Sequence, residues 1–303
     1  MHIVSISLGS SQRDHRTETT LLGRRIVLER IGANGDLRRA RQLFLEFDGE
    51  IDAFGVGGAD LALTVDGRAY PLFGVQHLVQ GLKTPAVDGG VVRAVLERKL
   101  VQRMTPLLPA PIEPKRVLIG VAVARYDLAR SFVDAGYATL FGDLGFGLGL
   151  PVPVRSLTTL HRLARLLLPI MGRLPFAWLY PTGAEQETIT PKFGPWYQWA
   201  TVLADDFHYL KRHLPDRLDG KIVVTNTTTL ADVELLKARG AGYLVTSTPR
   251  LGGRSYGTNV LEATLVAIAG KGRPLTPAEL EGMLSEDDLQ PTVLPLAVAN
   301  ARR

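Results

Sequence analysis

The stretch Lys115–Asp143, KRVLIGVAVARYDLARSFVDAGYATLFGD, decides the fold of this chain. It opens with a continuous apolar run, Val117–Val123, which is typical of a buried parallel strand. Apolar residues at helical spacing follow at 128–133, and a second β-rich run ends at Gly142 and Asp143. The order strand, helix, strand predicts the first half of a nucleotide-binding α/β fold.

The loop after the first predicted strand matches a dinucleotide fingerprint only in part. An acidic residue about 20 positions after the first turn can accept hydrogen bonds from a ribose diol, and Asp143 is placed there. A carboxylate repels a 2′-phosphate, so Asp143 favours NAD over NADP. The glycine part is missing, because no glycine lies between Gly120 and Asp127. The pattern predicts a doubly wound domain and leaves dinucleotide binding open.

Length and composition indicate a globular protein with more than one domain. The chain has 303 residues, of which 46% are hydrophobic and 21% are charged. A proline-rich segment at 106–114 predicts a linker. We therefore expect an N-terminal α/β substrate domain at 1–110, a Rossmann-like doubly wound parallel-sheet domain at 111–270 and a C-terminal helical tail at 271–303.

Several classes of protein are disfavoured by the composition. The chain has no cysteine, which excludes disulfides, thiolate metal sites and thiol nucleophiles. Its net charge is +5, but the arginines are scattered and not interleaved with aromatic residues, so no nucleic-acid partner is expected. The apolar segment 166–180 is too short to span a bilayer and is broken by prolines. We expect a cytoplasmic protein without a membrane partner, and a homo-oligomer is left open.

The first eighty residues contain local signals for hairpins and a helix. Two runs, Glu18–Ile31 and Leu61–Tyr70, predict β-hairpins. Asp36 is placed to cap a helix over Leu37–Phe47. The first strand ends in Gly9-Ser-Ser-Gln-Arg13, which favours either a small anion nest or a simple polar turn.

Polar residues follow two buried strands predicted in the second half, at Lys221–Asn226 and Tyr243–Thr248. In an open α/β sheet, ligands bind outside the carboxyl ends of the strands. This edge is expected to carry Thr225, Asn226, Thr227, Thr248 and Pro249.

Three short motifs occur in a familiar order: Thr84-Pro-Ala-Val-Asp-Gly-Gly, Thr246-Ser-Thr-Pro249 and Gly257-Thr-Asn-Val-Leu-Glu-Ala. On these motifs, residues from about 83 to 270 resemble the shikimate/quinate dehydrogenase group, including bacterial proteins labelled quinate 5-dehydrogenase. The resemblance implies an NAD(P)-dependent oxidoreductase of a small hydroxylated carboxylate. It also implies a nicotinamide cofactor and a small-molecule substrate, and Asp143 makes NAD the expected cofactor, with NADP less favoured.

The resemblance implies a catalytic lysine and aspartate. Asp88 matches the aspartate by motif, whereas Lys83 is proposed as the lysine on chemical grounds alone, because the first eighty residues contain no lysine. Arg13 or Arg254 is a candidate for binding a substrate carboxylate. The expected cofactor-binding residues are Gly120, Arg125, Asp143, Thr225, Asn226, Thr248, Pro249 and Gly257.

Two alternatives stay open beside the dehydrogenase. One is a metal-assisted enzyme that uses Asp205, Asp206 and His208, with His213 as a further ligand; the histidines are five apart, which does not place them on one helix face. The other is a non-catalytic small-molecule-binding protein that kept the Rossmann-like sheet and lost the phosphate loop.

Overall fold

The computed structural model describes residues 1–21, 23–175, 188–248, 250–251, 254–255 and 257–296. The chain forms two compact units, each built from three stretches of sequence. Unit 1 comprises Met1–Val95, Ala164–Gln186 and Arg250–Asp288, and unit 2 comprises Leu96–Leu163, Glu187–Pro249 and Leu289–Arg303. These units differ from the predicted domains 1–110, 111–270 and 271–303. The proline-rich segment 106–114 lies within unit 2.

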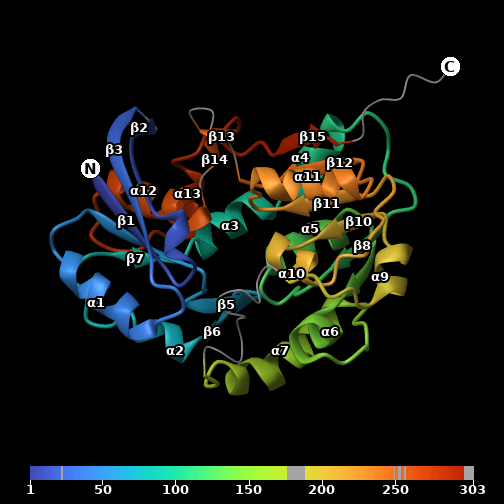
Figure 1. The fold of residues 1–303 in the computed structure, drawn as a ribbon, viewed down its shortest axis with the longest axis horizontal. Helices are drawn as coiled ribbons and strands as arrows, with labels where there is room; N and C mark the ends of the chain where they lie inside the picture. Colours follow the sequence, from blue (N-terminus) through green and yellow to red (C-terminus); the bar gives the residue numbers. More distant parts are fainter. Residues whose placement is uncertain (22, 176–187, 249, 252–253, 256, 297–303) are drawn as a thin grey trace. The chain divides into compact units, whose positions relative to one another are not determined.

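Unit 1 contains a five-stranded sheet with the order β2-β3-β1-β4-β7 (Figure 1). β1 runs parallel to β3 and β4, β4 runs parallel to β7, and β2 pairs antiparallel with β3. The strands are β1 (His2–Ser7), β2 (His15–Leu21), β3 (Arg24–Gly32), β4 (Ala53–Gly57) and β7 (Ala86–Val87), with two further antiparallel pairs, β5 (Ala62–Val65) with β6 (Arg68–Pro71) and β13 (Arg250–Leu251) with β14 (Arg254–Ser255). Both predicted hairpins are confirmed.

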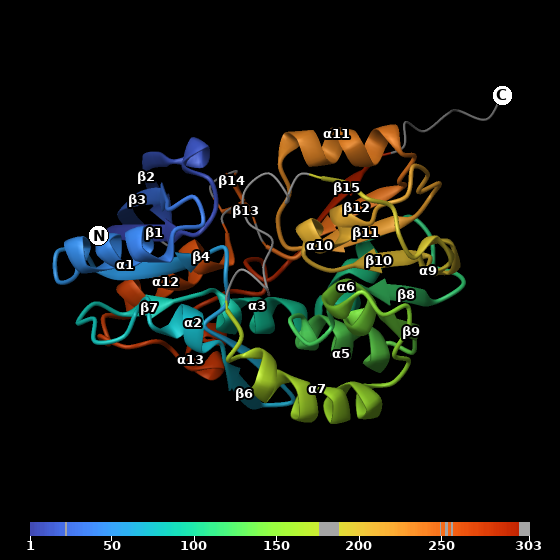
Figure 2. The same cartoon turned by 60° about the horizontal axis from the view of Figure 1, so that its bottom comes forward.

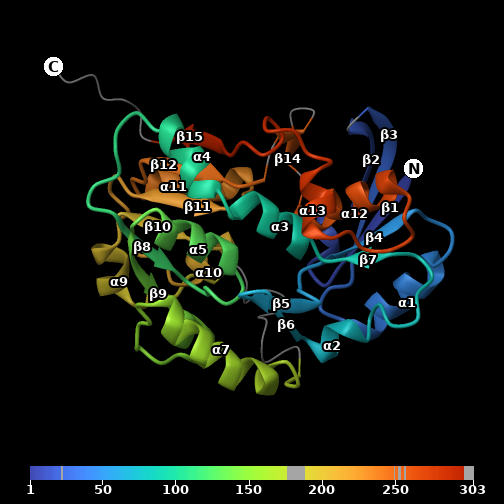
Figure 3. The same ribbon diagram turned by 180° about the vertical axis from the view of Figure 1, so that it is seen from behind.

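Helices cover both faces of the unit 1 sheet, as Figure 3 shows for α1 and α12 around β4. On one face Phe44 of α1 packs edge-to-face on Phe54 of β4, with ring centroids 5.1 Å apart. On the other face, a Cβ on Gly55 would lie 3.1 Å from Asn259 of α12, so a glycine permits this approach. The helices are η1 (Ser11–Arg13), α1 (Leu37–Phe47), α2 (Phe73–Gln76), α12 (Thr258–Ala269) and α13 (Pro277–Glu281), while α3 (Gly90–Glu97) and α7 (Leu157–Met171) contain residues of both units.

Unit 2 contains a six-stranded sheet with the order β15-β12-β11-β10-β8-β9. All neighbours run parallel except β12 and β15. The strands are β8 (Arg116–Ile119), β9 (Ala138–Phe141), β10 (Val202–Ala204), β11 (Ile222–Thr225), β12 (Tyr243–Thr246) and β15 (Thr292–Pro295). The chain leaves β8 toward β9 on one side and later continues from β10 on the other, as doubly wound sheets do. The predicted α/β fold class is confirmed.

Helices also lie on both sides of the unit 2 sheet, with α11 on one side and α5 on the other in Figure 2. Leu210 of α10 and Leu236 of α11 are buried against apolar strand residues such as Leu203 and Val223. The helices are α4 (Leu100–Met104), η2 (Thr105–Leu107), α5 (Tyr126–Asp134), α6 (Asp143–Leu148), α9 (Gly194–Trp199), α10 (Phe207–Arg212) and α11 (Leu230–Ala238). Within the described residues, no helix combines the length and apolarity needed to cross a bilayer.

The stretch that suggested the fold forms the expected strand, helix and strand, with one difference. The first strand ends at Ile119 instead of Val123, because the chain turns after Gly120 through backbone hydrogen bonds from Ala124 to Val121 and from Arg125 to Ala122. The turn places the amides of residues 121–125 at the carboxyl edge of the sheet. This edge is where the sequence predicts a ligand.

Candidate functional site

The carboxyl edge of the unit 2 sheet brings together several predicted residues. Thr225 ends β11 and is buried, and Asn226 follows it. Thr248 follows β12 and is also buried, with no hydrogen-bond partner for its hydroxyl among the described residues. The predicted placement of these three residues at the edge is confirmed, and their role in binding stays a prediction. Pro249 lies outside the described residues.

Carboxylates already occupy the amides of the loop after β8. Asp205, which follows β10, accepts a hydrogen bond from the amide of Val121, and Asp143 accepts one from the amide of Val123 at 2.9 Å. A Cβ on Gly120 would lie 2.6 Å from Oδ2 of Asp205, which is why this position suits glycine. A diphosphate would need these amides as donors, and anionic side chains would face it instead.

Asp143 was predicted to accept hydrogen bonds from a ribose, but its carboxylate is not exposed for such a contact. Its Oδ1 binds the Val123 amide, and its Oδ2 is shielded from solvent without a hydrogen-bond partner among the described residues. Burial raises the pKa of Asp143 to about 6. The residue is the first of α6, so the helix and not an open strand end determines its direction.

Arg125 lies inside unit 2, where the sequence predicted a cofactor contact. Its side chain is 3% exposed and forms an ion pair with Glu97, which is 1% exposed. A second hydrogen bond joins Nε of Arg125 to Oε2 of Glu97 at 3.2 Å. This pairing satisfies a buried charge and turns the guanidinium away from the phosphate position that the sequence suggested.

Asp205 and Asp206 are neighbours whose environments shift their pKa values in opposite directions. Burial raises the pKa of Asp205 to about 8. Burial also acts to raise the pKa of Asp206, but hydrogen bonds and charge from His208 outweigh it and hold that pKa well below its usual value. Asp206 caps α10 and contacts His208 Nδ1 at 2.9 Å. Among the described residues, no group of three His, Cys, Asp or Glu side chains is arranged to hold a metal ion.

The predicted catalytic pair is not assembled in unit 1. Lys83 is exposed, and its backbone amide donates to Asp48 at 3.0 Å. Asp88 accepts hydrogen bonds from the amides of Leu61 and Gly90, and burial, followed by the charge of Asp60, raises its pKa. No hydrogen bond or ion pair joins Lys83 to Asp88 in the described part of the chain. Their catalytic roles stay a prediction.

The remaining predicted residues lie near the start of α12. Gly257 is the residue before this helix, in an extended backbone conformation. The side chain of Arg254 lies outside the described part of the structure. A binding role for either residue stays a prediction.

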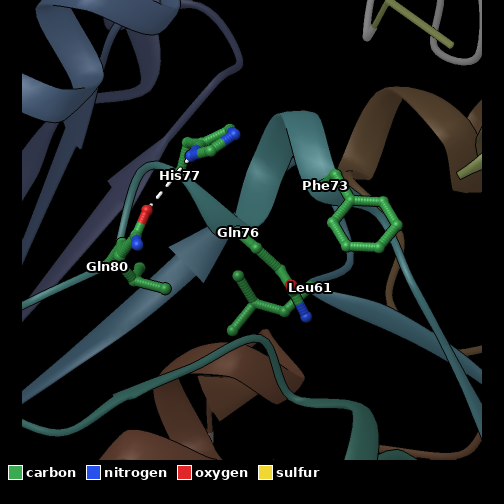
Figure 4. A pocket seen from close by; sticks show the side chains of 6 residues that line it. Leu61, Phe73, Gln76, His77 and Gln80 are labelled. Carbon is green, nitrogen blue, oxygen red and sulfur yellow. Dashed lines mark hydrogen bonds between the residues drawn. The ribbon is translucent and has the colours of Figure 1, made fainter. Parts of the chain in front are cut away.

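A pocket of about 420 Å³ lies in unit 1 beside α2 (Figure 4). We call it the α2 pocket, and it is lined by Leu61, Phe73, Gln76, His77, Val79 and Gln80. Figure 4 shows Gln76 beside Leu61, with the Phe73 ring on one side and the pair of His77 and Gln80 on the other. His77 Nδ1 lies 3.2 Å from Oε1 of Gln80.

Local sequence explains why these side chains converge. Phe73 and Gln76 are the first and last residues of the single-turn helix α2, His77 caps its end, and Gln80 lies in the turn that follows. Val75 and Leu78, which alternate with these residues, are buried in the unit 1 core. These four residues were not recognised as a site from the sequence. Because α2 is a single turn, helical spacing could not have revealed them.

Aromatic and amide groups give the α2 pocket a neutral character. Phe73 is 40% exposed, so its ring can contact a ligand. The guanidinium of Arg173 lies 5.2 Å from the centre of this ring, which fixes the ring by a cation–π contact. Gln76 and Gln80 each supply an amide that both donates and accepts hydrogen bonds. Such a set can bind hydroxyl groups on a small molecule with an apolar face.

The fold and this pocket define a two-unit α/β protein with a doubly wound sheet and a small-molecule-sized pocket. Residues 91–296 match the model of a protein family described as Domain of unknown function (DUF8754), and the chain belongs to this family. Residues 2–88 match a second model, described as Domain of unknown function (DUF8753). No curated protein matches the sequence significantly.

The solved structures that match this chain have low sequence identity and low TM-scores. GanP, a glucose-galactose binding protein from Geobacillus stearothermophilus, is 9% identical, with 97% of each chain covered and a TM-score of 0.40. A galactofuranose binding protein is 10% identical, with 98% of this chain and 95% of that chain covered and a TM-score of 0.36. A Mycobacterium smegmatis protein in complex with β-D-fucofuranose is 9% identical, with 94% of each chain covered and a TM-score of 0.33.

The dehydrogenase prediction is wrong. The matching family models are those of DUF8754 and DUF8753, and neither is described as a shikimate/quinate dehydrogenase. Short motifs suggested the shikimate/quinate group, but such motifs recur because they satisfy local backbone needs in many α/β proteins. NAD as a ligand is tested by none of the comparisons and stays a prediction, as does the cytoplasmic location.

Proposed function

We propose that this chain binds a small polyhydroxylated molecule, such as a sugar or polyol, without transforming it. The observation that supports the proposal is the α2 pocket, where α2 and the turn after it present an aromatic ring and two amides. An aromatic ring packs well on the C–H face of a sugar ring, while amides pair with its hydroxyls. The pocket volume of about 420 Å³ lies within the range of small-molecule sites.

The lining of the α2 pocket favours binding over catalysis. None of its six residues is a carboxylate, a lysine or a hydroxyl nucleophile. Its one imidazole, His77, is hydrogen bonded to Gln80 and has no carboxylate among the lining residues to orient it. Acid–base chemistry on a sugar usually needs two carboxylates placed around the reacting bond. A site built from these groups can recognise hydroxyls but lacks the means to move protons between them.

Thermal unfolding with a ligand panel tests this proposal. The panel contains neutral hexoses and pentoses, polyols, sugar acids, NAD and NADP, each at millimolar concentration. We expect at least one neutral sugar or polyol to raise the Tm, because a ligand at 100 times its Kd stabilises the folded state by about 2.7 kcal/mol. We also expect the ligand to be recovered unchanged by NMR. Rapid conversion of the ligand, or stabilisation by NAD alone, would contradict the proposal.

The variant Phe73→Ala tests whether the ligand binds in the α2 pocket. We expect it to weaken binding of the stabilising sugar up to about tenfold in calorimetric titration, because the loss of ring stacking costs about 0.5–1.5 kcal/mol. Leu45→Ala is the matched control, since Leu45 is an apolar side chain on α1 that is 53% exposed and does not line the pocket. Equal affinities for Phe73→Ala and the wild type would move the binding site elsewhere.

A further inference from the structure

Two arginines meet at the carboxyl end of β1. If Gly9 carried a Cβ, this atom would lie 2.8 Å from Nη2 of Arg13 and 3.3 Å from Nη2 of Arg30. The two guanidiniums therefore share the space that the missing side chain leaves open. We call Arg13 and Arg30 the β1 arginine pair.

The β1 arginine pair has an excess of positive charge. Arg30 forms an ion pair with Asp14 at 2.8 Å through Nη1, and the same Asp14 oxygen accepts the amide of Gly32 at 2.7 Å. Arg13 is exposed, and its guanidinium makes no hydrogen bond or ion pair with any described residue. Burial, followed by repulsion from Arg13, lowers the pKa of Arg30. One carboxylate thus faces two cations that repel each other.

The position of the pair within the sheet is that of a ligand site. β1 lies between β3 and β4, and the chain fills the β3 side of β1 before it continues on the β4 side. In doubly wound sheets, ligands bind outside the carboxyl ends of the strands at such a switch point. Gly9 lies two residues after the end of β1, and its missing side chain allows the two guanidiniums to approach the backbone there.

Three backbone amides of the loop are already paired with side chains, so the arginines and not these amides would hold a ligand. The amide of Gly9 donates to Ser7 Oγ, that of Ser11 to Asn34 Oδ1, and that of Gln12 to Ser10 Oγ. These contacts hold the loop in one conformation without an anion. The loop then serves as a fixed base for the side chain of Arg13.

We propose that the β1 arginine pair, whose guanidiniums meet over Gly9, binds an oxyanion group of a small molecule. The guanidiniums supply planar, charged N–H donors that match both carboxylate and phosphate oxygens. This site uses none of the residues of the α2 pocket and is a second function of unit 1. It therefore stands or falls independently of neutral-sugar binding.

Calorimetric titration of the full chain with inorganic phosphate, and separately with malonate, tests the site at low ionic strength. We expect saturable binding of at least one of the two anions, and the comparison separates tetrahedral phosphate from planar carboxylate chemistry. Arg13→Gln should weaken binding roughly tenfold or more, because it removes charge-assisted hydrogen bonds. Arg13→Lys should restore the charge but only part of the affinity, since lysine lacks the bidentate fork.

Two further variants keep the test decisive. Gly9→Ala retains both charges and fills the shared space, and we expect it to weaken binding as strongly as Arg13→Gln. Arg16→Gln removes one charge from an exposed arginine on the neighbouring strand β2 and should leave binding within about twofold of the wild type. Equal loss in Arg16→Gln and Arg13→Gln, or unchanged binding in Gly9→Ala, would overturn the proposal. Urea unfolding of Arg13→Gln should match the wild type, because this side chain is exposed.

Discussion

Replacement of Arg125 by methionine is expected to lower the free energy of unfolding by about 3–5 kcal/mol. The substitution leaves Glu97, which is 1% exposed, without the guanidinium that neutralises it. An unpaired carboxylate inside a protein lacks the solvation that water gives it. It therefore either destabilises the folded state or takes up a proton. Urea denaturation followed by tryptophan fluorescence measures the effect, since Trp196 and Trp199 lie in the same unit as Arg125.

The double variant Arg125→Met with Glu97→Met is the control for this prediction. It removes both charges at once, so we expect it to be more stable than Arg125→Met alone. The result also separates two interpretations of Arg125. An arginine held at the surface for a cofactor would be replaced at a cost of no more than about 0.5 kcal/mol. A loss that small would show that Arg125 does not depend on Glu97 for burial.

Stability near neutral pH is expected to depend on Glu262, a residue of α12 that is 1% exposed. Its Oε2 accepts the amides of Val91 and Val92 at 3.0 and 2.9 Å, at the start of α3. Burial, and then the charge of Asp88, raises the pKa of Glu262 from 4.5 to about 7. Between these values the folded state binds a proton that the unfolded state has released, so its stability falls as pH rises.

Glu262→Gln tests this linkage because glutamine keeps an oxygen acceptor for both amides but does not titrate. At pH 5 the variant and the wild type should have similar free energies of unfolding. At pH 8 the variant should exceed the wild type by about 2–3 kcal/mol, which corresponds to the raised pKa. Other buried acids, such as Asp143 and Asp205, titrate in both proteins and cancel in the difference. Parallel stability curves from pH 5 to pH 8 would contradict the assigned titration.

Local features of the fold could be predicted because their causes are local. Asp36 accepts the amides of Arg38 and Arg39 and starts α1 at Leu37, as the sequence indicated. The apolar run after Lys115 forms a buried parallel strand, because its residues contact layers on both faces. Local patterns could not predict that each unit is assembled from three separate stretches of the chain. Segment 250–288 joins unit 1 through contacts that no local pattern encodes.

The candidate sites show the same division. The placement of Thr225, Asn226 and Thr248 at one edge followed from strand order alone, since the carboxyl ends of parallel strands coincide. The direction of the Arg125 side chain could not be predicted from strand order, because it depends on Glu97, 28 positions earlier in the sequence. The sequence predicted that Arg125 contacts a cofactor. In the structure its side chain is buried and paired with Glu97.

The sequence by itself determined the alternation of strands and helices and the doubly wound sheet. Each of these depends on periodicity and capping within a few residues. Only the tertiary structure decided which charges face solvent: it paired Asp143 and Asp205 with loop amides and brought Arg13 beside Arg30. Residues far apart in the chain meet at these places, and a charge has no assigned role until its neighbours in space are known.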